Sequence, residues 1–284
     1  MSADLPPLRD VIAEFGLAAD KSFGQHYLLD LNLTAKIASL GGDLTGKTVL
    51  EVGPGPGGLT RTLLEAGAKE LVAIEMDARF IPALEMTGEA YDGRLTLIRN
   101  DALKTDDAAL VGDGAVIASN LPYNVGTPLL IKWLRSEPIW WSTAVLMFQR
   151  EVADRVVARA GDKAYGRLAV ITAARAEARL ALKIPARAFT PPPKVESAVV
   201  VLAPLPGDKR FMDIEALEII TESAFGQRRK MLRSSLKSAA GRIGTSAEAL
   251  LATAGIEPTA RAETIPPAGF MDLARAWRQA KNTR

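Results

Sequence analysis

The sequence of 284 residues contains no cysteine and a single histidine, His26. Because cysteine thiolates hold iron–sulfur clusters and many zinc ions, their absence excludes radical chemistry at such a cluster and thiolate metal sites. It also excludes pyrimidine methylation through a cysteine nucleophile. One histidine disfavours a Ser-His-Asp triad and a multi-histidine metal site. We therefore expect chemistry that uses an activated cofactor, carboxylates and amides, with no metal.

Long apolar runs are also missing, since none approaches the roughly 20 residues that a membrane helix requires. The first ten residues carry prolines and acids rather than a basic head followed by an apolar stretch. These absences predict a cytoplasmic protein with no membrane partner. The hydrophobic content of 48% is sufficient for a core. At this length, one catalytic domain with a small appendage is expected.

Neither sign of charge has a large excess, since the formal net charge is +2, but the basic and acidic residues are unevenly distributed along the chain. Residues 205–284 contain 13 Lys and Arg against 9 Asp and Glu, whereas residues 1–204 contain 22 against 24. The positive excess therefore lies in the C-terminal part.

From Lys47 onward, short β-rich apolar runs alternate with amphipathic stretches, which is typical of βαβ units and a largely parallel sheet. Two further β-like runs, 179–183 and 197–202, flank a proline cluster and are expected to pair. The predicted strands of the alternating part are Thr48–Val52, Leu71–Glu75, Leu95–Arg99, Ala115–Ser119 and Ala144–Phe148, and helices are predicted at Gly58–Ala66, Ala78–Met86 and Thr127–Leu134.

After Pro204 the pattern changes, because a Pro/Gly linker is followed by amphipathic helical segments alone. We therefore predict an α/β catalytic domain, residues 1–204, and a small all-α domain, residues 205–284. The helices predicted for the second domain are Ile214–Ala224, Arg228–Ala239, Ala247–Ala254 and Phe270–Gln279.

A glycine-rich turn connects the first of these strands to its helix. Gly53, Gly55 and Gly58 have the GxGxxG spacing of a dinucleotide site, so spacing alone does not separate NAD from S-adenosylmethionine. Pro54 and Pro56 remove N–H donors that a pyrophosphate would use. They favour S-adenosylmethionine.

Two acids follow the next two strands. Glu75 is placed to accept hydrogen bonds from both hydroxyls of a ribose, and Asp101 from an adenine amine. Each also suits an ordinary turn or surface position. Because the carboxyl ends of parallel strands meet at one crevice, their coincidence with the glycine turn predicts a Rossmann-like class I S-adenosylmethionine-dependent methyltransferase sheet.

The fourth strand ends in Asn120-Leu121-Pro122-Tyr123. The motif resembles the Asn-Pro-Pro-Tyr motif with which amine methyltransferases hold a flipped base. An adenine amine is a poor nucleophile, and the Asn120 side-chain oxygen with the Leu121 carbonyl could accept both of its protons. Pro122 stiffens the turn, and Tyr123 offers a face on which an extruded base can stack. An ordinary β-turn is the competing interpretation. Positioning would supply most of the acceleration.

On these motifs the chain resembles the ribosomal RNA adenine dimethyltransferase family, specifically its bacterial small-subunit branch. Five further segments carry the resemblance: residues 23–28, 149–152, 164–168, 189–199 and Ala224-Phe225-Gly226-Gln227-Arg228-Arg229-Lys230-Met231-Leu232-Arg233. The resemblance implies dimethylation of two adjacent adenines in a hairpin loop near the 3′ end of 16S ribosomal RNA, late in small-subunit assembly.

The resemblance also implies site residues. Phe189 would face Tyr123 across the target base, with core packing as the alternative. His26 stands where the family usually has Asn. The implied cofactor-binding residues are Gln25, His26, Leu28, Gly53, Gly55, Glu75, Met76, Asp101, Ala102 and Asn120.

Basic residues without an acid among them follow Gly226. If the segment is one helix, Arg229 and Arg233 lie one turn apart and form a face suited to phosphates, although a solvated face is the usual explanation of such a run. The expected RNA-binding residues are Arg228, Arg229, Lys230, Arg233 and Lys237.

Three other functions stay open at this point: large-subunit RNA methylation of the antibiotic-resistance type, an NAD-dependent oxidoreductase, and a non-catalytic assembly factor. The run at 225–230 disfavours the first, and the lack of a catalytic histidine, Tyr-Lys pair or cysteine disfavours the second. An intact Asn120–Tyr123 motif disfavours the third. A monomer is expected.

Overall fold

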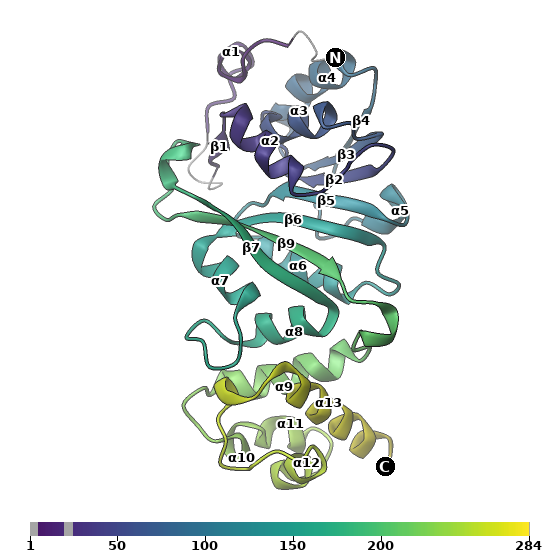
Figure 1. The fold of residues 1–284 in the computed structure, drawn as a ribbon, viewed down its shortest axis with the longest axis vertical. Helices are drawn as coiled ribbons and strands as arrows, with labels where there is room; N and C mark the ends of the chain where they lie inside the picture. Colours follow the sequence, from purple (N-terminus) through teal and green to yellow (C-terminus); the bar gives the residue numbers. More distant parts are fainter. Residues whose placement is uncertain (1–4, 20–24, 284) are drawn as a thin grey trace. The chain divides into compact units, whose positions relative to one another are not determined.

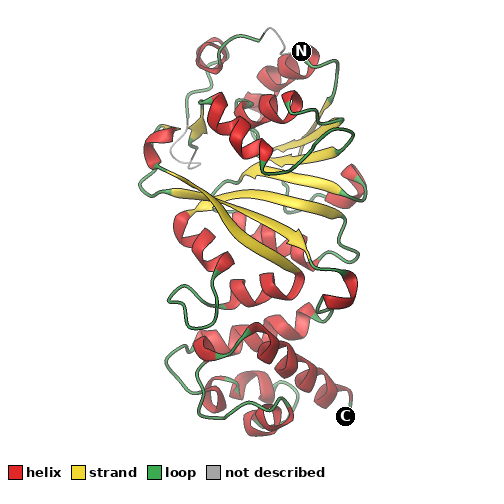
Figure 2. Cartoon of the chain, in the orientation of Figure 1, coloured by secondary structure: helices red, strands yellow, loops and turns green. Residues whose placement is uncertain are grey.

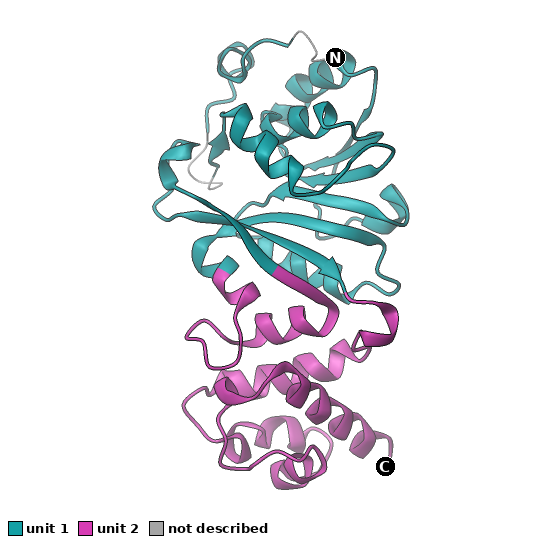
Figure 3. Cartoon of the chain, viewed as in Figure 1, with its two compact units in different colours: residues 1–153, 179–204 teal, residues 154–178, 205–284 magenta. Residues whose placement is uncertain are grey.

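The computed structural model describes residues 5–19 and 25–283. By its contacts the chain divides into two compact units, residues 1–153 with 179–204 and residues 154–178 with 205–284 (Figure 3). The change of unit after Pro204 falls where the sequence suggests a domain boundary. Residues 154–178 were expected within the catalytic domain, but they group with the C-terminal part.

A mixed sheet forms the centre of the first unit, with strand order β4-β3-β2-β5-β6-β9-β7 (Figure 1). β2, β3, β4, β5 and β6 run parallel, and β9 is antiparallel to β6. The predicted pairing of the last two strands is confirmed, because β9 and β7 are neighbours. The strands are β2 (Thr48–Val52), β3 (Glu70–Glu75), β4 (Leu95–Arg99), β5 (Ala115–Asn120), β6 (Trp141–Gln149), β7 (Ala176–Ile184) and β9 (Ser197–Pro204).

Burial explains why these segments form strands. β2, β3 and β5 are buried at nearly every position, as parallel strands are when helices cover both faces of their sheet (Figure 2). The first unit's helices are α1 (Leu8–Glu14), α2 (Leu31–Ser39), α3 (Gly58–Glu65), α4 (Ile81–Ala90), α5 (Asp107–Val111) and α6 (Gly126–Arg135), and α7 (Arg150–Val157) begins in the first unit and ends in the second.

The strand order reverses beside β2, whose neighbours β3 and β5 both follow it in the chain. Such a switch point in an open sheet leaves a crevice at the carboxyl ends of the strands. The glycine turn after β2, the acid at the end of β3 and the motif at the end of β5 all lie at this edge.

A two-stranded sheet that the sequence did not reveal joins two distant segments. β1 (Tyr27–Leu28) pairs antiparallel with β8 (Phe189–Thr190), so that Leu28 lies opposite Phe189. The pairing brings His26 close to the proline loop after Thr190.

The second unit is helical, as predicted. Its core includes Tyr165, Val170, Leu217, Phe270 and Trp277. Its helices are α8 (Arg167–Arg175), α9 (Ile214–Gly226), α10 (Leu232–Ser235), α11 (Lys237–Gly241), α12 (Ala247–Thr253) and α13 (Pro267–Asn282).

The single helix predicted at Arg228–Ala239 is wrong. Residues 227–230 form a turn, and two short helices follow. Met231 forms a β-bridge with Arg261, and the Leu232 N–H donates to the carbonyl of Ala260 at 2.8 Å. These long-range contacts interrupt the helix, so Arg229 and Arg233 do not share a helical face.

Candidate active site

A cavity of about 520 Å³ opens at the carboxyl ends of the strands in the first unit. All ten residues expected to bind the cofactor line it, and so do Leu121, Pro122 and Tyr123. Glu51, the acid just before the glycine turn, lines it as well, and so do Leu103 and Asp77, which the sequence did not single out. One cavity therefore brings together the glycine turn, both acids and the Asn120–Tyr123 motif.

The glycine turn depends on the absence of side chains. Gly53 has φ +69° and Gly55 has φ +55°, which few other residues adopt. At Gly58 a Cβ atom would lie 2.5 Å from the Leu28 carbonyl oxygen, too close to fit. The turn thus allows the β1 backbone to approach the start of α3.

Glu75 is tied to that turn. It is 8% exposed, and its carboxylate accepts hydrogen bonds from the N–H groups of Gly55 at 3.2 Å and Asp77 at 2.8 Å. Burial raises its pKa, while these two hydrogen bonds act in the opposite direction. A fixed acceptor at this position suits a pair of ribose hydroxyls.

Glu51 lies deeper in the same wall and is 1% exposed. The Thr60 hydroxyl donates to its Oε2 at 2.7 Å. Burial raises the pKa of Glu51 to about 8. The free protein therefore holds a neutral carboxylic acid here near pH 7.

Asp101 is held in a tight turn after β4. Its Oδ1 accepts the Leu103 N–H at 3.0 Å, and its own N–H donates to the Asn100 side chain at 2.8 Å. Met76, 65% exposed, and Leu103, 39% exposed, offer apolar surface at the same cavity. An acceptor beside apolar side chains fits an adenine ring.

Asn120 ends β5 at the cavity wall, and Leu121 follows it there. The Ser119 hydroxyl donates to the Val52 carbonyl, which ties β5 to β2 just before the motif. The Tyr123 hydroxyl forms a 2.9 Å hydrogen bond with the Ser197 hydroxyl, and burial raises its pKa. The tyrosine ring is thereby anchored at one end.

Phe189 pairs with Leu28 in the two-stranded sheet, and the centroid of its ring lies 6.5 Å from that of His26. It is 2% exposed and packs in the core with Ile184 and Val199, because its pairing with Leu28 turns it inward. It does not line the cavity. That Phe189 faces Tyr123 across a target base stays a prediction, and the burial of its ring favours the core-packing alternative.

His26 instead places a ring near the tyrosine. Its centroid lies 5.9 Å from that of Tyr123 and 6.5 Å from that of Phe189. Its Nδ1 lies 2.7 Å from the Pro191 carbonyl oxygen, so that nitrogen donates and fixes the ring.

The five basic residues expected to bind RNA belong to the second unit and are all exposed. Arg228, Arg229 and Lys230 lie in the turn after α9, Arg233 in α10 and Lys237 at the start of α11. They are exposed cations without a common helix.

Metal sites and membrane spans are both absent from residues 5–19 and 25–283. No group of three or more His, Cys, Asp or Glu side chains there could hold a metal ion. No helix in that part is long and apolar enough to cross a membrane.

Comparison with known proteins agrees with this geometry. The sequence model of the family described as "Ribosomal RNA adenine dimethylase" matches residues 16–279. "Ribosomal RNA small subunit methyltransferase A" of Maricaulis maris is 67% identical, over 99% of this chain and 98% of the relative. The protein of the same name from Xanthobacter autotrophicus is 55% identical, over 98% and 96%.

Solved structures are similar as well. A dimethyladenosine transferase from Plasmodium falciparum superposes with a TM-score of 0.74 at 25% identity, over 88% of this chain and 96% of that one. The 23S rRNA methyltransferase ErmE gives 0.64 at 27% identity, over 89% and 100%. Sheet, cavity and sequence therefore lead to one assignment: the chain belongs to the ribosomal RNA adenine dimethylase family and is an S-adenosylmethionine-dependent rRNA methyltransferase.

Proposed function

We propose that this enzyme dimethylates the N6 amines of two adjacent adenines in a hairpin loop near the 3′ end of 16S ribosomal RNA, within the small subunit or its precursor. The observation that carries the proposal is that the Asn120–Tyr123 motif lines the same cavity as the glycine turn, Glu75 and Asp101. The printed names of the relatives at 67% and 55% identity favour the small subunit.

S-adenosylmethionine supplies an activated methyl group on a sulfonium. We assign its ribose to Glu75 and its adenine to Asp101, between Met76 and Leu103. Ala102 then lies under the ring edge. Gly53 and Gly55 leave room for the ligand at the turn, and Gln25, His26 and Leu28 cover the methionine end.

The target amine is held by Asn120 and Leu121 in this proposal. The Asn120 side-chain oxygen and the Leu121 carbonyl accept its two protons, which favours a pyramidal nitrogen with its lone pair toward the methyl group. Pro122 keeps the turn rigid. Tyr123 stacks on the extruded base, anchored by Ser197. Orientation supplies most of the rate.

The exposed cations of the second unit are assigned to RNA phosphates. RNA helices are recognised mainly by shape and backbone, and loops by their bases. Basic residues that bind the phosphates of a stem therefore complement a pocket that binds a base of the loop. We further propose that the enzyme acts as a monomer in the cytoplasm.

The likeness to ErmE makes large-subunit RNA the second candidate. Methyl transfer from labelled S-adenosylmethionine to small subunits that lack the modification tests the choice, with large subunits in parallel. Label in 16S adenines as N6,N6-dimethyladenosine is expected. Label confined to 23S RNA would replace the small-subunit proposal.

The same assay tests the site through Asn120→Ala, which should reduce methyl transfer by at least about 100-fold because an orienting acceptor is removed. Asn32→Ala is the matched control, since this asparagine is exposed in α2, outside the cavity. Full activity of Asn120→Ala would rule out the proposed amine site.

A further inference from the structure

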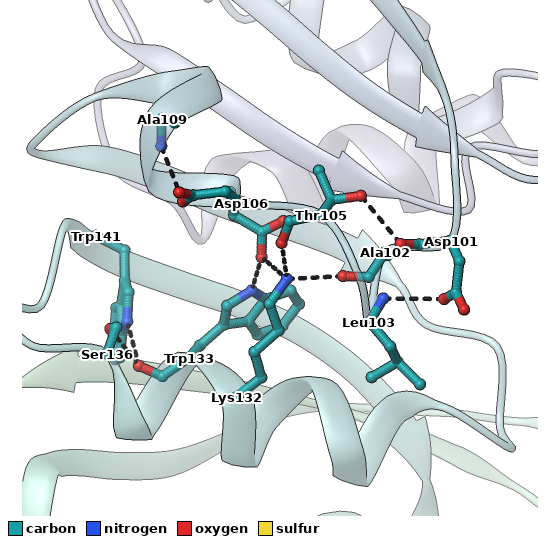
Figure 4. Close-up of polar contacts among 11 residues, drawn as sticks. Asp101, Ala102, Leu103, Thr105, Asp106, Ala109, Lys132, Trp133, Ser136 and Trp141 are labelled. Carbon is teal, nitrogen blue, oxygen red and sulfur yellow. Dashed lines mark hydrogen bonds and ion pairs between the residues drawn. The ribbon is translucent and has the colours of Figure 1, made fainter.

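The loop that carries Asp101 is hydrogen-bonded to the side chain of Lys132, a residue that the sequence did not single out. Lys132 extends from α6 toward residues 101–105 (Figure 4). Its ammonium donates to the carbonyls of Ala102 at 2.7 Å and Thr105 at 2.6 Å, and to Asp107 Oδ2 at 2.9 Å. An ammonium has three N–H donors, and all three are used.

Asp107 completes the arrangement. Its side chain is 1% exposed, and its Oδ2 also accepts the Trp133 indole N–H at 2.6 Å. Lys132 and Trp133 are adjacent on α6, which begins at Gly126, soon after Tyr123. One buried carboxylate thereby joins the helix that follows the amine-binding motif to the loop that follows β4.

The Lys132–Asp107 ion pair is partly buried, with the Asp107 side chain 1% and the Lys132 side chain 27% exposed, and its energetics indicate a role beyond stability. Removing two charges from water costs as much as or more than their attraction returns, so apolar replacements are often neutral. The Oδ1 atom of Asp107 is buried and has no hydrogen-bond partner among the described residues, which adds to the cost. The Lys132 ammonium fixes the orientation of the Ala102 and Thr105 carbonyls through hydrogen bonds, which an apolar side chain would not do.

Asp101 belongs to the same turn. The Asp101 carbonyl accepts hydrogen bonds from the Lys104 N–H at 2.9 Å and the Thr105 hydroxyl at 3.0 Å. Its carboxylate is oriented by the Leu103 N–H. The turn is therefore closed on itself, and Lys132 fixes the closed turn to α6.

We propose that Lys132, paired with Asp107, is a positioning residue for adenine recognition: it holds the Asp101 turn at the height where the carboxylate meets the adenine amine of the cofactor. This inference rests on the proposed placement of the adenine at Asp101. It assigns specificity to two residues that do not themselves touch the ligand.

The test measures binding of two ligands that differ at one group. S-adenosylhomocysteine has the adenine amine, and S-inosylhomocysteine has a carbonyl oxygen in its place. The wild-type protein should prefer the first by about tenfold or more, the value of one well-placed hydrogen bond. In Lys132→Met that preference should shrink towards unity, with S-adenosylhomocysteine bound about tenfold more weakly.

Lys104→Met is the matched control. Lys104 contacts the same Asp101 carboxylate at 3.8 Å, but its side chain is 80% exposed. It should leave the preference unchanged. If Lys132→Met leaves Asp107 as an unpaired buried charge and does not fold, Lys132→Met with Asp107→Asn takes its place, since the amide oxygen still accepts the Trp133 N–H.

Each outcome has one meaning. If the wild-type protein binds both ligands equally, the adenine does not contact Asp101, and the proposed placement fails. A wild-type preference that persists in the folded Lys132 variants overturns the positioning role. Equal weakening of both ligands with an unchanged preference also overturns it, because a merely structural role produces that result. Loss of preference in the Lys132 variants alone supports it.

Discussion

At the scale of single residues, Glu51 makes cofactor binding sensitive to pH. With its pKa raised to about 8, Glu51 is protonated near pH 7 in the free protein. S-adenosylmethionine is cationic at sulfur, and a nearby cation favours the carboxylate. Binding should therefore release a proton, and affinity should rise up to about tenfold per pH unit below the pKa. Calorimetry in buffers of different ionisation enthalpy measures both.

Glu51→Gln is the control for that prediction, because it cannot ionise and should show no such proton release. Its stability gives a second check. The pKa of Glu51 in the folded protein lies above its ordinary value of 4.5, so its contribution to stability is present below pH 4.5 and is lost as pH rises through about 8. Unliganded Glu51→Gln should therefore be more stable than wild type at high pH. Equal proton release in both proteins would contradict the assignment.

Gly58→Ala should destabilise the protein by about 1–3 kcal/mol, because the new methyl group meets the Leu28 carbonyl oxygen and the backbone must shift. Thermal unfolding measures the change. Gly241→Ala, where a Cβ meets open space in α11, is the control and should be neutral or stabilising. Equal melting temperatures for Gly58→Ala and wild type would contradict the close approach of β1.

At the scale of elements, sequence patterns predicted the strands and helices that are determined by their own pattern of burial. The parallel strands were found because each is a short apolar run, and β2 and β4 begin and end where expected. β1 and β8 were missed because two-residue strands carry no period. Their pairing is also what places Phe189 in the core, so the role of that ring could not be read from local sequence.

The same limit applies to the segment 228–239. Its composition is compatible with a helix, and the bonds of Met231, Leu232 and Arg233 to residues 258–261 interrupt it. The cavity residues were predictable because a parallel sheet brings strand ends together. Lys132 was not, because two of its three partners are backbone carbonyls, which leave no trace in sequence.

α13 supports the second unit mainly through its apolar face. Phe270→Ala should reduce the free energy of unfolding by about 3–5 kcal/mol, since the ring is fully buried in the core of that unit. Denaturant unfolding followed by tryptophan fluorescence measures the reduction. Gln279→Ala, exposed on the same helix, should change stability by less than about 0.5 kcal/mol. Similar reductions in both variants would contradict the proposed importance of that face.

At the scale of the whole molecule, we expect that substitutions in the second unit can weaken RNA binding without changing the affinity for the cofactor. Arg228→Gln with Arg229→Gln should weaken RNA binding and reduce its salt dependence, by about 0.7–0.9 in slope for each phosphate that is no longer neutralised. Affinity for S-adenosylhomocysteine should stay unchanged. Filter binding over a series of salt concentrations provides the slopes.

Lys36→Gln with Lys69→Gln is the control, because it removes the same charge from exposed positions of the first unit. If both double variants reduce the salt dependence of RNA affinity equally, net charge governs RNA binding, and the exposed basic residues of the second unit have no special role.

The division of the chain into interleaved units also constrains how the protein is made. Tyr165 and Val170, in a segment between β6 and β7, are buried in one cluster with Leu273 of α13. A ribosome synthesises the first segment long before the last helix. α9 also packs on α8 and is synthesised first, so the apolar face of α8 is covered in two stages, and the second unit closes only when α13 emerges. Truncation after Pro204 would leave that face permanently open, so the catalytic sheet alone should aggregate rather than fold as a free domain.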